Sequence, residues 1–389
     1  MYGQSFGQHY TDTNVAGLLS SLIDVKSPLR IVDLGVGQGS LLGAASACWS
    51  DSTLFGIDID KKNLAISKAL LRRGTFRQAD CLSSKLSLTL KKLLASADVV
   101  LCNPPFLELD HAAARGATSR DWQQTAEAKF LSLSMQLLKP SGSLGIILPA
   151  RYVSGPAYKA FREQMLSTCN LVSVTSLPSS TFKTAQVETY FLVLRKELTI
   201  DGVAVQAIGV NGLLAEALVL AKNQAIERMD YGFYAACPAW SEDAVPLSIL
   251  LTEDIRRGSA SSGRATPDWM FHTSDFKKYL DGHLNFSQKY VSSEHGVACA
   301  GDILIPRVGS RCLHHCAIVD SGQVAISDCI YRLRVAPEWQ AYVFAYLRSS
   351  AGVAMRKLSA HGSCAKLLGK QALLDLPVPM GSIQQLQKL

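Results

Sequence analysis

Apolar, β-rich runs alternate with helical patterns through the first 200 residues, and this alternation is the strongest constraint on how the chain can fold. The strand-like runs are residues 29–34, 52–58, 97–102, 144–148 and 190–195, and clear helical stretches are 61–73 and 127–138. Strands that alternate with helices of this length form βαβ units, in which helices cover both faces of a parallel sheet. We therefore predict an α/β domain built on a parallel-centred sheet.

The second part of the sequence has a different texture, and the change lies near residues 225–245. Beyond it the runs become shorter, Gly and Ser become more frequent, and isolated hydrophobic strands such as 301–306 appear. A chain of 389 residues is long enough for two or three domains, each with its own core. We therefore expect one domain over residues 1–235 and a smaller α+β domain over residues 236–389.

Composition narrows the class of protein. The chain is 48% hydrophobic and 18% charged, with 12 Tyr and 13 Phe, which excludes a disordered protein. It has no stretch of about 18 apolar residues that predicts a membrane span, no export-signal pattern in residues 1–10, and ten scattered Cys. We expect a soluble cytoplasmic protein in a reducing compartment. The net charge of +7 allows a nucleic-acid partner without requiring one.

A glycine-rich turn follows the first predicted strand. Asp33 stands at the end of that strand, and Gly35, Gly37 and Gly39 follow before a helix begins. Glycines let a backbone turn sharply and approach a ligand closely, and a helix N-terminus adds partial positive charge. By itself the pattern is equally compatible with a tight turn that binds nothing.

Acidic residues at the next two strand tips favour a ligand. Asp58 ends the second strand, where a carboxylate can accept hydrogen bonds from ribose hydroxyls. A third strand tip, at residues 78–81 between the runs 52–58 and 97–102, carries Asp80 and Cys81, and an acid there can bind an adenine amino group. Together with the glycine turn, these tips predict a nucleoside site at the carboxyl edge of the sheet.

The fourth strand tip carries Asn103-Pro104-Pro105-Phe106, which points to the chemistry. Two consecutive prolines fix the backbone and remove two N–H donors, so the Asn103 side chain and the Pro104 carbonyl form a rigid pair of acceptors. Hydrogen bonds from an exocyclic amine to these acceptors favour a more tetrahedral nitrogen, which can attack an activated methyl group. Phe106 offers a flat face for a planar base. The alternative is a turn that merely ends a buried strand.

These motifs, in this order, resemble those of S-adenosylmethionine-dependent amino-methyltransferases, and more specifically the γ-class of N6-adenine DNA methyltransferases. The resemblance covers roughly residues 3–196 and implies a Rossmann-like catalytic domain with S-adenosylmethionine as cofactor. Within residues 7–11 it places Tyr10 and Thr11 at the methionine end of the cofactor, although Asp12 stands where the family usually has proline. Residues 144–149, followed by Arg151 and Tyr152, fit the family's later strand. The resemblance also implies that Phe106 and Phe182 sandwich the extruded adenine, whereas Phe182 alone would be read as a core aromatic.

The second half resembles the target-recognition domain of type I restriction specificity subunits. The segments that carry this resemblance include 246–248, 254–258, 301–309, 326–334 and 376–379. It implies double-stranded DNA as the partner, in a restriction-modification or related system with any restriction endonuclease as a separate protein. The DNA-contacting candidates, which lie in Gly/Ser-rich surroundings, are Arg256, Arg257, Arg307 and Arg311. Each is also compatible with an ordinary solvated loop charge.

The leading hypothesis is therefore a site-specific DNA adenine-N6 methyltransferase that flips its target base. One alternative is methylation of RNA or of a protein glutamine, and another is a DNA-specificity module that needs a partner subunit for activity. The segment 312–316, Cys-Leu-His-His-Cys, has metal-ligating residue types. Its spacing lacks the usual Cys-x₂-Cys pairs, so we expect structural cysteines and surface histidines there and no metal.

Overall fold

A computed structural model describes residues 13–83, 85–106, 121–178, 188–197, 202–209, 211–236, 244–258, 270–286, 296–309, 312–361 and 366–380. The chain divides into two compact units, Met1–Tyr231 and Gly232–Leu389. The division lies within residues 225–245, where the texture of the sequence changes. No helix in the described ranges is both long and apolar enough to cross a membrane.

The first unit is built on a nine-stranded sheet with the order β3-β2-β1-β4-β5-β7-β6-β8-β9. Its strands are β1 (Arg30–Leu34), β2 (Thr53–Asp58), β3 (Thr75–Gln78), β4 (Ala97–Cys102), β5 (Leu138–Pro149), β6 (Asn170–Ser176), β7 (Thr189–Arg195), β8 (Val203–Ala207) and β9 (Leu218–Leu220). The strands from β3 to β5 are parallel, whereas β7 pairs antiparallel with both β5 and β6. The predicted α/β class with a parallel-centred sheet is confirmed.

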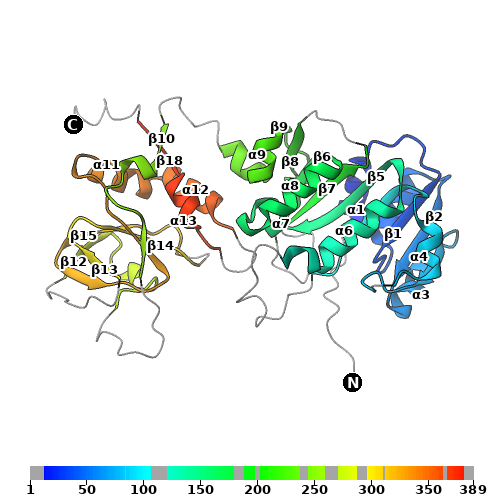
Figure 1. Cartoon of the computed structure of the whole chain (residues 1–389), viewed down its shortest axis with the longest axis horizontal. Helices are drawn as coiled ribbons and strands as arrows, with labels where there is room; N and C mark the ends of the chain where they lie inside the picture. The colour runs from blue at the N-terminus through cyan, green and yellow to red at the C-terminus, as the bar shows by residue number, and fades with distance from the viewer. Residues whose placement is uncertain are drawn as a thin grey trace, which may run out of the picture. The chain divides into compact units, whose positions relative to one another are not determined.

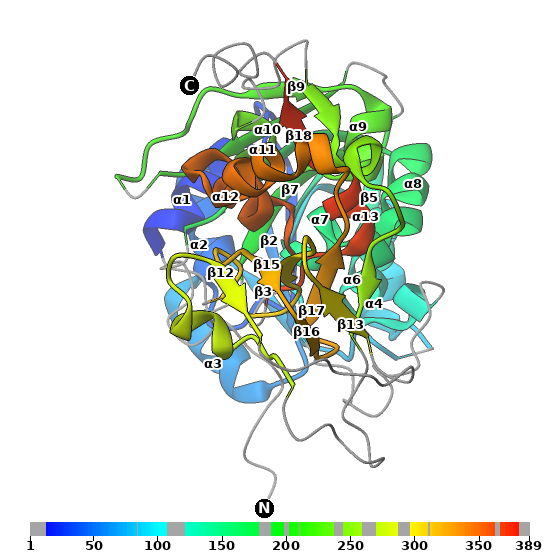
Figure 2. The ribbon, with the colours of Figure 1, turned by 90° about the vertical axis from the view of Figure 1, so that its left-hand side faces the viewer.

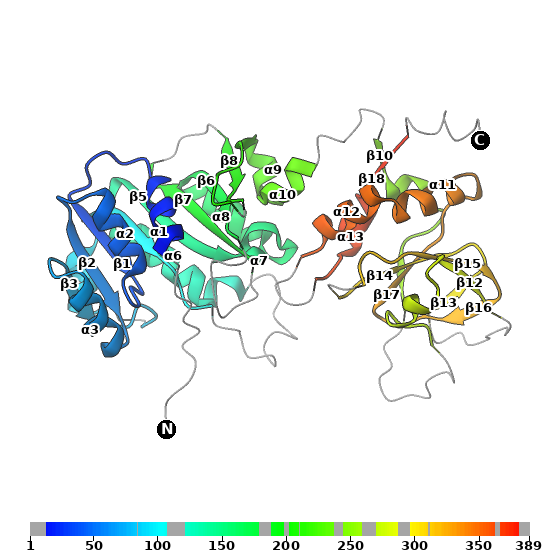
Figure 3. The ribbon, with the colours of Figure 1, turned by 180° about the vertical axis from the view of Figure 1, so that it is seen from behind.

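Helices cover both faces of this sheet. The helices are α1 (Thr13–Ser21), α2 (Ser40–Cys48), α3 (Lys61–Leu70), α4 (Leu88–Leu93), α6 (Ala126–Leu137), α7 (Ala150–Ser154), α8 (Lys159–Thr168) and α9 (Lys222–Glu227), while α10 (Tyr231–Ala236) begins at the last residue of the first unit. Helices α6 and α8 lie over the face seen in Figure 1, and α1 and α2 lie over the face seen from behind in Figure 3. Strand β4 is almost wholly buried between them, because its apolar sequence Ala97–Cys102 packs on both faces.

The second unit contains a five-stranded sheet with the order β11-β17-β14-β15-β12, and two two-stranded pairs, β10–β18 and β13–β16. The strands are β10 (Ala244–Pro246), β11 (Arg256–Arg257), β12 (His283–Asn285), β13 (Val297–Cys299), β14 (Ile303–Pro306), β15 (Ala317–Ser321), β16 (Gln323–Ala325), β17 (Ile330–Leu333) and β18 (Pro377–Pro379), and the helices are α11 (Pro337–Arg348), α12 (Ser350–Ser359) and α13 (Lys370–Leu374). Figure 2 shows α11 and α12 beside each other next to this sheet. Ile303, Ile305 and Leu333 share a core with Val343 and Leu347 of α11, which confirms an α+β unit.

One arginine joins the C-terminal helices of the first unit from within. The Arg162 side chain, fully buried on α8, donates through Nε to the Ile226 carbonyl at 2.7 Å and through Nη2 to the Glu227 carbonyl at 2.7 Å. Its Nη1 donates to the carbonyls of Tyr152 and Gly155 at 3.2 and 2.9 Å. The guanidinium therefore satisfies carbonyls at the ends of α7 and α9, which could not pair with each other.

We expect Arg162→Met to lower the free energy of unfolding of the first unit by about 3–5 kcal/mol, because it leaves several buried carbonyls without a donor. Urea unfolding followed by far-UV circular dichroism measures the change. Arg195→Met, at a half-exposed arginine of the same sheet, is the control and should cost less than about 1 kcal/mol. Equal losses in the two variants would contradict the assignment.

Candidate active site

The glycine turn has the geometry that the sequence indicates. Gly35, Gly37 and Gly39 have φ values of 73, 52 and 86°, in the left-handed region that residues with a Cβ rarely adopt. The amides of Gly35 and Val36 both donate to the Ile57 carbonyl, at 2.8 and 2.9 Å. The turn is thereby fixed to the second strand before α2 begins.

Asp58 ties the tip of β2 to this turn. Its carboxylate accepts a hydrogen bond from the Gly37 amide through Oδ2 and another from the Asp60 amide through Oδ1, both at 2.8 Å. Asp60 in turn begins α3 by accepting the Lys62 amide at 2.8 Å. Two strand tips that are about 20 residues apart in sequence therefore form one rigid surface.

The tip of β3 joins the same surface. The Ala79 amide donates to the Asp58 carbonyl at 3.1 Å, and Asp80 accepts the Leu82 amide at 2.8 Å. Burial and the negative charges of Asp58 and Asp80 raise the pKa of the Cys81 thiol to about 12. Acidic side chains from three strands therefore meet at this carboxyl edge, as the sequence predicts.

Asp33 lies beneath this surface and is only 1% exposed. Burial, and next the charge of Asp58, raise the pKa of the Asp33 carboxyl to about 8. Its Oδ1 has no hydrogen-bond partner among the described residues. A buried carboxyl of this kind is costly to ionise, and a bound cation or donor would lower that cost.

Asn103 follows β4 next to the turn. Leu34 pairs with Cys102 in the parallel register, so Gly35 and Asn103 leave neighbouring strands at the same level. A Cβ built on Gly35 would lie 3.7 Å from the Asn103 carbonyl oxygen and 3.5 Å from Cε1 of Phe130 on α6. Phe106 is half-buried and packs on the core of the first unit. The structure thus brings the glycine turn and the Asn-Pro-Pro-Phe motif together.

A second cluster at this edge joins Arg151 and Tyr152, which the family resemblance includes, to a partner that the sequence did not indicate. Glu127, fully buried in the first turn of α6, forms an ion pair with Arg151 of α7. The Tyr152 hydroxyl lies 2.7 Å from Thr125 Oγ1 and 3.3 Å from Glu127 Oε2. Burial raises the pKa of Glu127, and Arg151 opposes that shift. Arg151 directly after a strand was the only local signal, and nothing nearby in sequence identified Glu127 as its partner.

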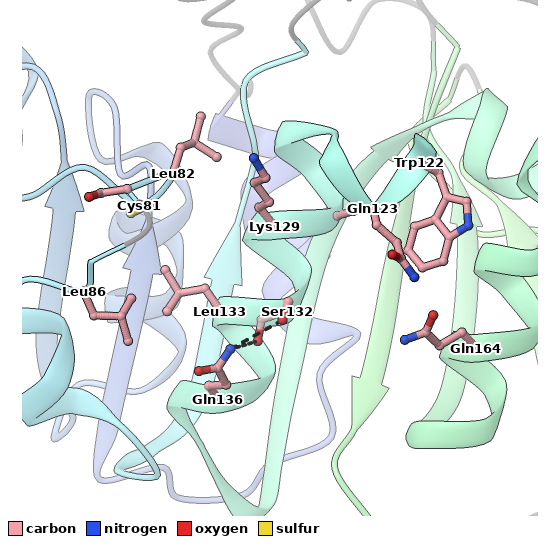
Figure 4. Close-up of a pocket in the computed structure, with 12 residues that line it drawn as sticks. Cys81, Leu82, Leu86, Trp122, Gln123, Lys129, Ser132, Leu133, Gln136 and Gln164 are labelled. Atoms are coloured by element: carbon pink, nitrogen blue, oxygen red, sulfur yellow. Dashed lines mark hydrogen bonds between the residues drawn. The ribbon is translucent and has the colours of Figure 1, made fainter. Parts of the chain in front are cut away.

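A hollow of about 660 Å³ lies along the outer side of α6 (Figure 4). Its lining combines the segment after β3 with residues of α6 and Gln164 of α8: Cys81, Leu82, Ser83, Leu86, Trp122, Gln123, Ala128, Lys129, Ser132, Leu133, Gln136 and Gln164. Of these described lining residues, Cys81 alone belongs to the set that the sequence predicts for the cofactor. The hollow therefore adjoins the strand tips without containing most of them.

The arginines of the second unit divide between two faces of its sheet. In the antiparallel register of β11 with β17, Arg256 lies opposite Arg332 and Arg257 lies opposite Tyr331. Neighbouring residues of a strand point to opposite faces, so Arg256 and Arg257 do so too. Arg256 lies 3.8 Å from the Glu253 carboxylate. Burial raises the pKa of Tyr331, while the charges of Arg307 and Arg257 lower it, so these two arginines lie near one tyrosine.

The remaining predicted site residues, Tyr10, Thr11, Phe182 and Arg311, lie outside the described residues.

The Cys-Leu-His-His-Cys segment is held by an arginine. Arg356, fully buried on α12, donates to the carbonyls of Leu313, His314 and His315 at 2.9, 3.2 and 2.8 Å. The His315 ring stacks on Phe276 with 5.7 Å between ring centroids. These contacts give the segment a packing role within the second unit.

The first unit is an α/β domain whose strand tips bring a glycine turn, acidic side chains and the Asn-Pro-Pro-Phe motif to one edge of the sheet. The chain belongs to the N-6 DNA Methylase family, whose sequence model matches residues 1–230. The first unit is therefore a methyltransferase domain.

Two curated relatives match part of this chain. The rRNA N(6)-adenosine-methyltransferase metl-5 of Caenorhabditis elegans is 25% identical over 146 residues, which are 35% of this chain and 61% of that protein. The ribosomal RNA large subunit methyltransferase G of Shewanella amazonensis is 31% identical over 128 residues, which are 30% of this chain and 28% of that protein. The chain spans about three fifths of the first relative and under a third of the second.

Among solved structures, a type I restriction-modification system methyltransferase subunit from Streptococcus thermophilus covers 56% of this chain and 51% of its own. The TM-score is 0.43 and the identity is 19%.

The raised pKa of Asp33 predicts a pH-dependent effect on stability. A carboxyl whose pKa rises from about 4 unfolded to about 8 folded contributes stability below about pH 4, and this contribution is lost as the pH rises towards 8. Asp33→Asn does not ionise, so its stability relative to wild type should increase between about pH 5 and about pH 8 by a few kcal/mol. Thermal unfolding across this range measures the difference. A difference that is constant with pH would contradict the prediction.

Proposed function

We propose that this protein transfers a methyl group from S-adenosylmethionine to N6 of an adenine in DNA. The observation that carries the proposal is the contact between the glycine turn and Asn103-Pro104-Pro105-Phe106. It puts a candidate cofactor surface and a candidate amine-binding motif on neighbouring strands of one sheet. Membership of the N-6 DNA Methylase family supports this assignment.

The residues present fit S-adenosylmethionine, which when bound supplies an activated methyl group on a positively charged sulfur. The turn of Gly35, Gly37 and Gly39 allows the backbone to approach the cofactor closely. Asp58 offers an acceptor to the ribose of the cofactor, and Asp80 offers one to the amine of the cofactor's adenine. Asp33 Oδ1, which has no hydrogen-bond partner in the part of the chain that the structure describes, lies in the same acidic surroundings, which favour a cationic ligand.

Asn103 would orient the target amine. Cys81, which follows β3, would line the cofactor site. The Asn103 side-chain oxygen and the Pro104 carbonyl accept hydrogen bonds from the exocyclic NH₂ and leave its lone pair directed at the methyl group. The cofactor would supply the methyl group for the new nitrogen–carbon bond, and the amine, held by Asn103 and Pro104, would release a proton to solvent. Phe106 supports one face of the base, and by family resemblance Phe182 supports the other and Tyr10 and Thr11 contact the cofactor.

Residues 236–389 would read the DNA. Arg257 and Arg307, gathered near Tyr331, offer positive charge to phosphates or guanine edges, and Arg311 follows in the same segment. Arg256 lies on the opposite face of its strand, beside Glu253. RNA is the second candidate substrate, because both curated relatives are named as ribosomal RNA methyltransferases.

Asn103→Ala should abolish methyl transfer, by at least about 100-fold, while leaving cofactor binding within severalfold of wild type, because the variant removes an acceptor for the target amine and not the strand tips. Transfer of labelled methyl from S-adenosylmethionine to genomic DNA, total RNA or protein measures the activity and identifies the substrate. Methylation of RNA alone by the wild type would replace DNA with RNA in the proposal. No methylation of any substrate would overturn it.

Arg257→Gln should weaken DNA binding more than Arg256→Gln, its neighbour on the opposite face. Loss of one phosphate contact should also reduce the salt dependence of binding, by about 0.9 in the slope of log K against log salt. Fluorescence anisotropy with a DNA duplex at several salt concentrations compares the two variants. If Arg256→Gln has the larger effect, the DNA lies on the other face of the sheet.

A further inference from the structure

The Glu127–Arg151 ion pair occupies a particular place in the first unit. Strand β5 ends at Pro149, and α7, which carries Arg151, begins at the next residue. Strands β4 and β5 are parallel neighbours, with Cys102 opposite Ile146. Arg151 therefore lies at the same carboxyl edge as Asn103, one strand away, and adjacent strands are only about 4.8 Å apart.

The guanidinium of Arg151 is fixed but not enclosed. It pairs with the fully buried Glu127 carboxylate and lies over the Tyr152 ring, with Cζ 5.3 Å from the ring centroid. Yet 34% of the Arg151 side chain is exposed. Its Nε is buried and has no hydrogen-bond partner among the residues that the structure describes. The cation is thus held by one carboxylate, while about a third of the side chain stays accessible to a second acceptor.

A purely structural role explains this arrangement poorly. Two helices can be joined at least as well by apolar side chains of similar volume, because burying an ion pair costs much of what it gains. Arg162, eleven residues further along, shows what a structural arginine looks like in this protein: it is fully buried and donates to four carbonyls. Arg151 differs, since part of it faces solvent at the edge that carries the candidate catalytic motif.

We propose that Arg151, positioned by Glu127, binds a backbone phosphodiester next to the target adenosine. A planar guanidinium can hold a carboxylate through one edge and a phosphate through another, and a fixed cation loses little side-chain entropy on binding. The contact would hold the strand while its adenine occupies the Asn103 motif. This inference rests on the proposed nucleic-acid methylation and adds a substrate-binding residue to that site.

Two double variants of the full-length protein test the proposal. Glu127→Gln/Arg151→Gln replaces the ion pair by neutral hydrogen-bonding groups, and Glu127→Leu/Arg151→Met replaces it by apolar ones. If the Gln/Gln variant does not fold, the Leu/Met variant still tests the proposal, because apolar replacements of buried ion pairs often leave protein stability unchanged or increase it. Arg195→Gln is the matched control: Arg195 is 39% exposed, is paired with the Asp24 carboxylate, and ends β7 at the opposite edge of the sheet.

Binding is measured by fluorescence anisotropy with a mixed-sequence DNA duplex, and in a second arm with a single-stranded RNA, across a series of salt concentrations. Phosphate contacts carry no sequence information, so the target sequence need not be known. We expect the double variants to bind about five- to tenfold more weakly at moderate salt. The slope of log K against log salt should fall by up to about 0.9 for the duplex or about 0.7 for the single strand, with Arg195→Gln unchanged.

Steady-state methylation separates binding from positioning of the chemistry. The double variants should raise KM for the nucleic acid severalfold with kcat within about twofold of wild type, whereas disturbed packing of α6 would lower kcat. Folded variants with wild-type affinity, salt slope and KM would overturn the inference and leave the proposed function standing. A wild type that neither binds nor methylates nucleic acid would overturn the proposed function itself, and this inference with it.

Discussion

The two amide hydrogen bonds accepted by Asp58 are the contacts on which the candidate site depends. One comes from Gly37 in the turn after β1 and the other from Asp60 at the start of α3. Because the carboxylate ends a buried strand, these bonds fix the turn, the second strand tip and a helix start relative to one another. The third tip joins through the Asp58 carbonyl, and the fourth through contact of Gly35 with Asn103. The parallel register of β4 with β5 then places Arg151 at the same carboxyl edge.

Negative charge accumulates at this edge of the sheet, which is unfavourable for the domain without a bound ligand. Asp33, Asp58 and Asp80 lie close enough to raise the pKa of Cys81 together, and Asp58 raises that of Asp33. Such repulsion costs folding free energy and is reduced when a positively charged ligand binds. The sulfonium cofactor proposed above, with its ribose hydroxyls and adenine amine, would match both the charge and the acceptors. The electrostatic cost of the strand tips is therefore intelligible as part of ligand binding.

Much of this edge could be predicted from the sequence because each of its parts is local. A strand, its terminal acid and the following glycine or proline are contiguous, and parallel topology brings such tips together. The fold class is confirmed, whereas the roles assigned to Asp33, Asp58, Asp80 and Asn103 stay predictions. The Glu127–Arg151 pair could not be foreseen, since nothing in either local sequence indicates the partner. The opposite orientations of Arg256 and Arg257 depend on a two-residue strand too short to show periodicity.

Three buried or half-buried arginines show how one residue type serves different ends in this chain. Arg162 and Arg356 are enclosed and each donates to several carbonyls, so each acts as a cross-link whose charge is dispersed over several dipoles. Arg151 has a full carboxylate as its partner, which neutralises the cation locally while fixing its direction. A guanidinium placed in this way adds little long-range attraction and offers a precise hydrogen-bonding fork at short range. That property suits orientation of a strand already attracted by other charges. Under the two proposals made here, exposed arginines such as Arg257 would capture the nucleic acid and Arg151 would align it.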